Sequence, residues 1–112
     1  MLCSEIREIL AEEEEVQRHK DALASLLNMR SKQLHESLEE RIRRAQNNGE
    51  WIDLSQEERA ALHQQEKLHV KWQVDRLRHE QARTRGRLAA LRQAKTRAKH
   101  ILAVEAVYRR RP

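Results

Sequence analysis

Proline, glycine and aromatic residues are nearly absent from this chain of 112 residues, which has one proline, two glycines, two tryptophans, one tyrosine and no phenylalanine. The proline is the last residue, so long stretches contain nothing that would break a helix. Aromatic residues make up only 3% of the chain. A compact domain of this length fills its centre with bulky side chains, so this composition argues against a globular core.

Cysteine and long apolar runs are also scarce. The single cysteine, Cys3, cannot form an internal disulfide, and we interpret it as a small free apolar side chain, although it could cross-link a dimer. No apolar run approaches the roughly 20 residues of a membrane span, and the first residues lack the pattern of a signal peptide. One thiol without a secretory signal fits a reducing compartment, so we expect a cytoplasmic protein with no membrane span.

Charged residues, in contrast, make up 37% of the chain, with both signs interleaved. Such a composition can indicate disorder, but the scarcity of proline and glycine favours long helices. Apolar residues recur at alternating spacings of three and four, the 3.5-residue repeat of a coiled coil. In the first helix the predicted seam positions are Leu2, Ile6, Ile9, Glu13, Val16, Lys20, Leu23, Leu27, Arg30 and Leu34, followed by Leu38, Ile42 and Ala45. In the second helix they are Val70, Val74, Leu77, Gln81, Thr84, Leu88, Leu91, Lys95, Ala98 and Leu102.

One break separates the two stretches, at Asn47-Asn48-Gly49. The Ser-x-x-Glu pattern at Ser55 and Glu58 is a capping box and predicts the start of the second helix, with Asp53 as an alternative cap. We therefore predict an all-α fold in which residues 1–112 form a single coiled-coil hairpin, with helices at 4–46 and 55–108 and a turn at 47–54.

The distribution of charge favours antiparallel pairing of these helices. Residues 1–50 hold eleven acidic against eight basic residues, whereas residues 51–112 hold seven acidic against fifteen basic residues. A reversal near residue 50 brings the acidic run Glu12–Glu15 opposite the basic segment around residues 85–88. A parallel homodimer would instead bring the basic segments together, so we predict that the chain folds back on itself.

In this alignment the second helix is longer than the first, and about its last ten residues have no counterpart. They contain the most apolar segment of the chain, followed by three arginines. An apolar helix end without an internal partner is either frayed or a docking surface, and we favour docking. The candidate partner-binding residues are Ile101, Leu102, Val104, Val107, Tyr108, Arg109, Arg110 and Arg111.

No pattern of catalytic, cofactor-binding or metal-binding residues is recognisable, so we predict a protein that is not an enzyme and needs no cofactor. The pairs His63–His69 and His69–His79 are six and ten residues apart, and neither spacing places two imidazoles on one helix face within a turn. The cations around residues 76–99 suggest nucleic acid, but they lie among the seam residues, and no asparagine follows Asn48. Nucleic-acid binding is therefore the least favoured reading.

The chain resembles the small stalk proteins of type III secretion, namely the flagellar FliJ protein and its injectisome counterparts of the SpaM and YscO type. The matching features are AEEEEV at Ala11–Val16, LSQEE at Leu54–Glu58 and the long basic heptad helix that follows. The resemblance implies a cytoplasmic antiparallel hairpin that serves protein transport in the export apparatus, where it contacts an ATPase ring and the export gate.

Two other functions remain open at this point. The chain could be a cytoskeletal or complex-scaffolding coiled coil, or a basic helical protein that binds nucleic acid. In each case the hairpin could act as a monomer or within a homo-oligomer.

Overall fold

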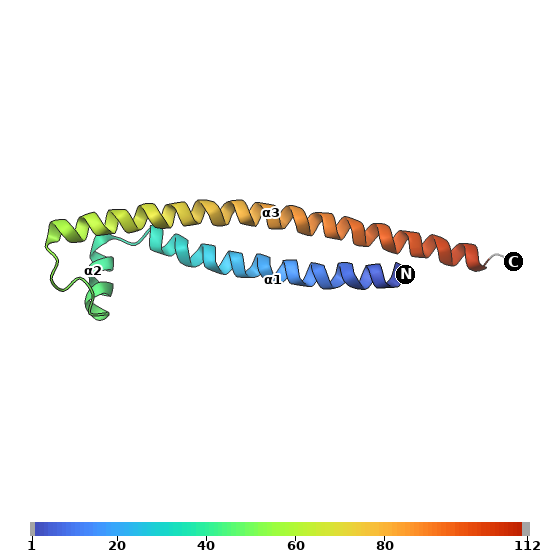
Figure 1. Ribbon diagram of the computed structural model, residues 1–112, viewed down its shortest axis with the longest axis horizontal. Coiled ribbons are helices and arrows are strands. Elements are labelled where there is room, and N and C mark those ends of the chain that lie inside the picture. Colours follow the sequence, from blue (N-terminus) through green and yellow to red (C-terminus); the bar gives the residue numbers. More distant parts are fainter. Residues whose placement is uncertain (1, 111–112) are drawn as a thin grey trace. The chain divides into compact units, whose positions relative to one another are not determined.

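The computed structural model describes residues 2–110, and these residues form three helices (Figure 1). They are α1 (Leu2–Leu34), α2 (Leu38–Asn47) and α3 (Gln56–Arg110). No strand occurs within residues 2–110, so the prediction of an all-α fold is confirmed. The number of helices differs from the two that we expected.

The helix predicted at 4–46 is interrupted at residues 35–37, between α1 and α2. Ser37 has an extended backbone (φ −74°, ψ 163°), and its Oγ accepts a hydrogen bond of 3.1 Å from the N–H of Glu40. Ser37 therefore caps α2 with the same Ser-x-x-Glu pattern that begins α3. The apolar spacing changes to steps of four at this point of the sequence. Steps of four alone are compatible with one continuous helix that is less supercoiled, but the cap at Ser37 produces a break.

The turn that ends α2 follows from the backbone freedom of Gly49. Asn48 caps the helix, and Gly49 adopts the left-handed conformation (φ 71°). The N–H of Gly49 donates to the carbonyl oxygen of Gln46 (3.2 Å), and the N–H of Glu50 donates to that of Ala45 (2.7 Å). These two bonds form a Schellman motif, which satisfies the last carbonyl groups of the helix.

The capping box at the start of α3 is confirmed. Ser55 Oγ accepts a hydrogen bond from the N–H of Glu58 (3.2 Å), and Glu58 Oε1 accepts one from the N–H of Ser55 (3.5 Å). The frame that begins with Ser55 is therefore the one used, and the alternative cap at Asp53 is not.

The chain divides into two compact units, and both α1 and α3 contribute to each of them. The terminal unit comprises residues 2–24 and 80–110 of the described chain, and the middle unit comprises residues 25–79. The buried residues of the terminal unit are Val16, Leu23, Thr84, Leu88 and Ala98. Those of the middle unit are Arg41, Ala45, His63 and Val74. Each unit thus has a narrow seam rather than a broad core.

The predicted seam positions are confirmed except for Leu2, whose side chain lies outside the part that the structure describes. From Ile6 to Ala45 and from Val70 to Leu102, every predicted position is buried or half-buried. Leu10, Leu26 and Met29, which lie beside the stripe, are exposed. The 3.5-residue spacing therefore identifies the packed face of each helix correctly.

Contacts within the terminal unit join segments that run in opposite directions. Glu13 pairs with Lys95, and His19 lies beside Glu80, so residue numbers rise along α1 while they fall along α3. The acidic run of α1 meets the basic segment of α3 as the charge distribution predicted, since Glu12 pairs with Arg87. A single hairpin over the whole chain stays a prediction.

Candidate functional site

The C-terminal surface of α3 contains the residues that we predicted to bind a partner. We define it as the described members of that set: Ile101, Leu102, Val104, Val107, Tyr108, Arg109 and Arg110. All of them are exposed except Leu102, which is half-buried. Arg111, the last predicted member, lies outside the described residues. The exposed fraction is 58% for Val107 and 70% for Tyr108, values that are high for large apolar side chains.

The exposure of this surface follows from where the seam ends. Ala98 is the last buried residue of α3, and after the half-buried Leu102 every residue up to Arg110 is exposed. Within the terminal unit, α3 continues beyond the first residues of α1 (Figure 1). The exposed apolar side chains of Val104 and Val107 therefore lie past Ala98, the last buried residue of the seam.

A shallow hollow of about 300 Å³ lies on this end of α3. It is lined by His100, Ala103, Val104, Val107 and Tyr108. Its lining is mostly apolar, with the rings of His100 and Tyr108 beside three small aliphatic side chains, so it suits contact with an apolar side chain of a partner.

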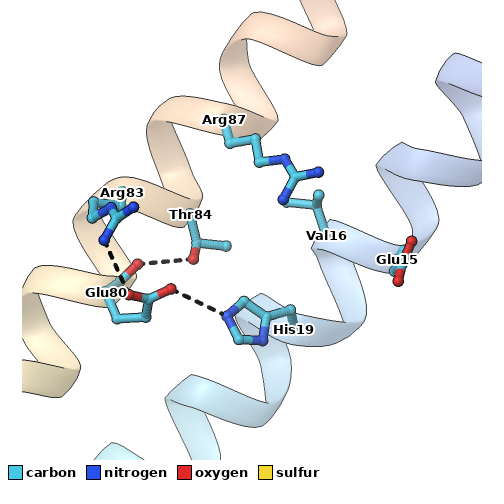
Figure 2. A pocket seen from close by; sticks show the side chains of 7 residues that line it. All are labelled: Glu15, Val16, His19, Glu80, Arg83, Thr84 and Arg87. Atoms are coloured by element: carbon cyan, nitrogen blue, oxygen red, sulfur yellow. Dashed lines mark hydrogen bonds and ion pairs between the residues drawn. The ribbon is translucent and has the colours of Figure 1, made fainter.

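A second hollow, of about 460 Å³, lies between α1 and α3 in the terminal unit (Figure 2). His19 Nε2 lies 3.6 Å from Glu80 Oε1, and Arg87 extends from α3 toward Val16 of α1. The hydroxyl of Thr84 donates to the carbonyl oxygen of Glu80 (2.8 Å), which explains how this polar residue can occupy a buried seam position. Glu80 thus contacts both His19 and Arg83, whose Nη1 lies 3.8 Å from Glu80 Oε2. Arg87, in contrast, pairs with Glu12 outside the lining of the hollow.

The ion pairs of the terminal unit change the pKa of their members. Lys95 Nζ donates to both carboxylate oxygens of Glu13, at 3.0 and 2.7 Å, and this bonding lowers the pKa of Glu13 although partial burial acts to raise it. Arg92 lies 3.6 Å from the same carboxylate and contributes less to this lowering. Glu12 raises the pKa of Arg87 by accepting its hydrogen bond.

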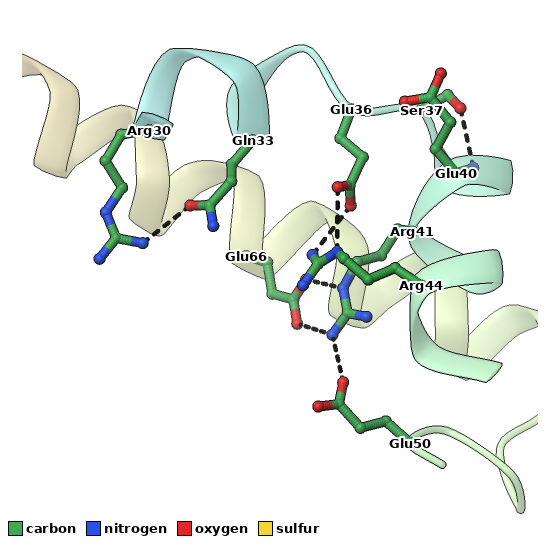
Figure 3. Close-up of polar contacts among 9 residues, drawn as sticks. All are labelled: Arg30, Gln33, Glu36, Ser37, Glu40, Arg41, Arg44, Glu50 and Glu66. Carbon is green, nitrogen blue, oxygen red and sulfur yellow. Dashed lines mark hydrogen bonds and ion pairs between the residues drawn. The ribbon is translucent and has the colours of Figure 1, made fainter. Parts of the chain in front are cut away.

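The middle unit contains a buried arginine, Arg41, that the sequence analysis did not predict to be buried (Figure 3). Arg41 is only 5% exposed. Its Nε and Nη2 donate to the two carboxylate oxygens of Glu66, at 2.8 and 3.0 Å, and Nη2 also donates to Glu50 (3.2 Å). The bond from Arg41 lowers the pKa of Glu66, and the same bond raises the pKa of Arg41. This bidentate pair is a strong and directional contact between α2 and α3.

Arg41 also stabilises the conformation of Trp51. The guanidinium carbon lies 3.9 Å from the centre of the Trp51 ring, which is a cation–π contact. Trp51 has a positive φ of 62°, an unfavourable conformation for a bulky side chain. Its carbonyl oxygen accepts a hydrogen bond from Arg59 Nη2 (3.1 Å). The two arginines therefore offset the strain of this turn.

A signal for the buried Arg41 was present in the spacing. The seam of α1 continues from Leu34 through steps of four, three and four to Leu38, Arg41 and Ala45, and all three are buried or half-buried. Our interpretation followed Ile42 because it is apolar. The heptad spacing alone would have predicted that position 41 is buried. Because arginine is charged, we did not assign it to the seam.

No group of three or more His, Cys, Asp or Glu side chains in the described part of the chain could hold a metal ion. Within residues 2–110, no helix combines the length and the apolar character needed to cross a membrane. Comparisons of this chain with protein-family models, curated proteins and solved structures find no match. The resemblance to secretion stalks therefore stays a hypothesis.

Proposed function

We propose that this chain is a non-enzymatic coiled-coil adaptor that binds a protein partner through the C-terminal surface of α3. The observation that carries the proposal is the exposure of apolar residues at a helix end, where Val104 and Val107 line one shallow hollow. Exposed apolar patches at the end of a long helix are typical of docking surfaces. The adjacent Arg109 and Arg110 extend this surface with positive charge, which favours a partner with acidic residues.

In its more specific form, the proposal is that the chain is a cytoplasmic stalk of a type III secretion export apparatus. The support for this form is the AEEEEV segment at Ala11–Val16 and the LSQEE segment at Leu54–Glu58. The third matching feature is the long basic heptad helix, which corresponds to the 55 residues of α3. In this form the whole chain is an antiparallel coiled-coil hairpin.

The test is affinity purification of the tagged full-length chain from the organism that encodes it. Mass spectrometry then identifies the proteins that copurify. The stalk form predicts that the wild-type chain brings down the ATPase subunit of the export apparatus. Exchanging both valines, in the variant Val104→Ser/Val107→Ser, should reduce this recovery at least about tenfold, because it removes the apolar contact area. Helix content measured by circular dichroism should stay nearly unchanged.

The matched control is Leu68→Ser, which removes another exposed apolar side chain of α3 (67% exposed) far along the helix from the docking end. Its recovery of the ATPase should equal that of the wild type. Recovery of cytoskeletal or scaffold proteins in place of the ATPase would replace the stalk form with the scaffolding reading. Unchanged recovery with the double valine variant would reject the C-terminal surface as the docking site.

A further inference from the structure

Three cations of α3 in the terminal unit, Arg85, Arg92 and Lys99, lie at intervals of seven residues. Seven residues make almost two full turns of an α-helix, so these side chains share one flank at steps of about 10.5 Å along the axis. All three are exposed. We call them the cation row. They lie outside the hollow of Figure 2, whose arginines Arg83 and Arg87 are on the other flank of the seam.

The acidic residues of α1 leave the cation row largely uncompensated. Among the described residues, Glu13 is the carboxylate that reaches the row, at 3.6 Å from Arg92, and it is already bonded to Lys95. Arg85 donates to the neutral amide oxygen of Gln81 (3.0 Å). Glu12 is turned to the other flank, where it pairs with Arg87. The flank that carries the row therefore has an excess of positive charge.

An apolar side chain lies on the same side of the terminal unit. Leu10 precedes Glu13 by one turn of α1, and Glu13 faces Arg92. Leu10 is 41% exposed. A helix placed along this flank would cover Leu10 with its apolar stripe while its polar side faces the cation row.

We propose that this flank of the terminal unit binds an acidic α-helix of another protein that carries aspartate or glutamate at every seventh residue. Such a helix packs as a third strand of the coiled coil, and its repeat equals the spacing of the cation row. Charges at matching intervals determine the register and the choice of partner, as the flanking charges of coiled coils do. This surface is separate from the C-terminal surface of α3 and does not depend on the proposed function.

A second copy of this chain is a poorer occupant because its own acids do not match the whole row. Its acidic residues occur at a seven-residue spacing in pairs at most, such as Glu8 and Glu15 or Glu14 and Asp21, and never as three in succession. No segment of a second copy therefore offers a carboxylate to each of the three cations.

A nucleic acid also fits this flank poorly. The other flank carries Glu12 and Glu15, which repel phosphates, and among Phe, Trp and Tyr, residues 80–110 contain Tyr108 alone. The binding of single strands uses stacking of bases on such aromatic rings. The seven-residue spacing of the cation row matches the repeat of a coiled-coil helix better than it matches a nucleic acid.

The test measures binding of the full-length chain to a fluorescently labelled synthetic helical peptide with glutamate at one position of each heptad. The variant Arg85→Glu/Lys99→Glu reverses two members of the cation row. Its matched control, Arg83→Glu/Arg97→Glu, reverses two exposed cations of the same helix at the same separation of fourteen residues but on a different face. Fluorescence anisotropy should show about tenfold weaker binding for the first variant and a change of less than about twofold for the control. The variant Val104→Ser/Val107→Ser should bind the peptide like the wild type.

Several results would overturn this inference. One is equal weakening by the two charge-reversal variants. Another is wild-type binding no tighter than that of a peptide whose glutamates are moved off the heptad spacing. A third is a dimer of the wild-type chain in analytical ultracentrifugation that the variant Arg85→Glu/Lys99→Glu converts to a monomer. This result would assign the flank to a second copy of the chain. Displacement of the peptide by an equimolar DNA duplex assigns it to a nucleic acid.

Discussion

The terminal unit and the middle unit both use ion pairs to join α1 or α2 to α3, but they place the charges differently. In the terminal unit the pair between Glu12 and Arg87 lies at the surface, with 43% and 63% of the two side chains exposed. In the middle unit Arg41 is buried and donates three hydrogen bonds to two carboxylates. The buried ion pair of the middle unit should therefore contribute more to the free energy of unfolding than the exposed pair of the terminal unit. Solvent screens an exposed pair, whereas a buried guanidinium is destabilising unless its carboxylate partners are present.

This difference separates two roles for charge in a protein that has little apolar surface to bury. The exposed pairs along α1 and α3 favour the correct direction and register of the helices, but each contributes little to stability. The buried pair joins α2 to α3 and holds the turn at Trp51. We expect substitutions in the middle unit to have the larger effects.

The strongest test of the comparison is the removal of the buried guanidinium. Arg41→Ala should lower the free energy of unfolding by about 3 kcal/mol, because Glu66 and Glu50 lose their partner and Trp51 loses its cation–π contact. The control Arg43→Ala removes an exposed arginine of the same helix and should change it by less than about 0.5 kcal/mol. Urea denaturation followed by circular dichroism measures both values. Equal effects would mean that Arg41 is not buried in solution.

The carboxylate partner gives a smaller effect that depends on pH. Glu66→Gln should cost about 1–2 kcal/mol at neutral pH, because it removes a charge-assisted bidentate bond. Arg41 lowers the pKa of folded Glu66, so this stabilisation is complete above the ordinary glutamate pKa of about 4.3 and is lost as the pH falls through the lower folded-state pKa.

Thermal denaturation between neutral and acidic pH checks this prediction. The melting temperature of the wild type should fall more steeply below about pH 4 than that of Glu66→Gln. Glu14→Gln, which changes an exposed glutamate, serves as the control and should follow the wild type. Parallel curves for the wild type and Glu66→Gln would contradict the contribution of the ion pair.

The half-buried pair of Glu13 and Lys95 in the terminal unit should have an effect on stability between that of the buried Arg41 and that of the exposed Arg87. Lys20 and Lys95 are charged residues at predicted seam positions, so the sequence alone predicts that leucine at these positions raises the melting temperature. The structure reverses this expectation for Lys95, because Lys95 is the main partner of Glu13, whose side chain is only 18% exposed. Lys95→Leu alone should lower the melting temperature by about 3 °C, whereas Glu13→Leu/Lys95→Leu should raise it.

Lys20→Leu provides the comparison for this pair in a thermal scan. Lys20 is half-buried, with no ion pair recorded among the described residues, so leucine there should raise the melting temperature. A fall would show that position 20 is exposed in solution.

The smallest effect is expected at the surface pair. Arg87→Ala should shift the melting temperature by less than about 2 °C, because the side chains of both Arg87 and Glu12 remain largely solvated. Added salt should remove even this difference, since exposed charges are screened. A shift as large as that of Arg41→Ala in the same thermal scan would remove the distinction between the two units.

The sequence alone was sufficient to predict the helical class, the seam of each helix and the capping box at Ser55. These features depend on residues within a few turns of one another, and periodicity reveals them directly. The sequence also located the break after Asn47, where Gly49 supplies the left-handed backbone.

The tertiary structure decided which of two competing local signals prevailed and which charges became buried. At residues 35–37 the apolar stripe favoured one continuous helix, whereas the cap at Ser37 favoured a new one, and the cap prevailed. Arg41 can be buried because Glu66, 25 residues further along the chain, supplies a carboxylate at the right distance. The cost of burying a charge depends on groups that only the folded chain brings together, so local patterns cannot reveal it.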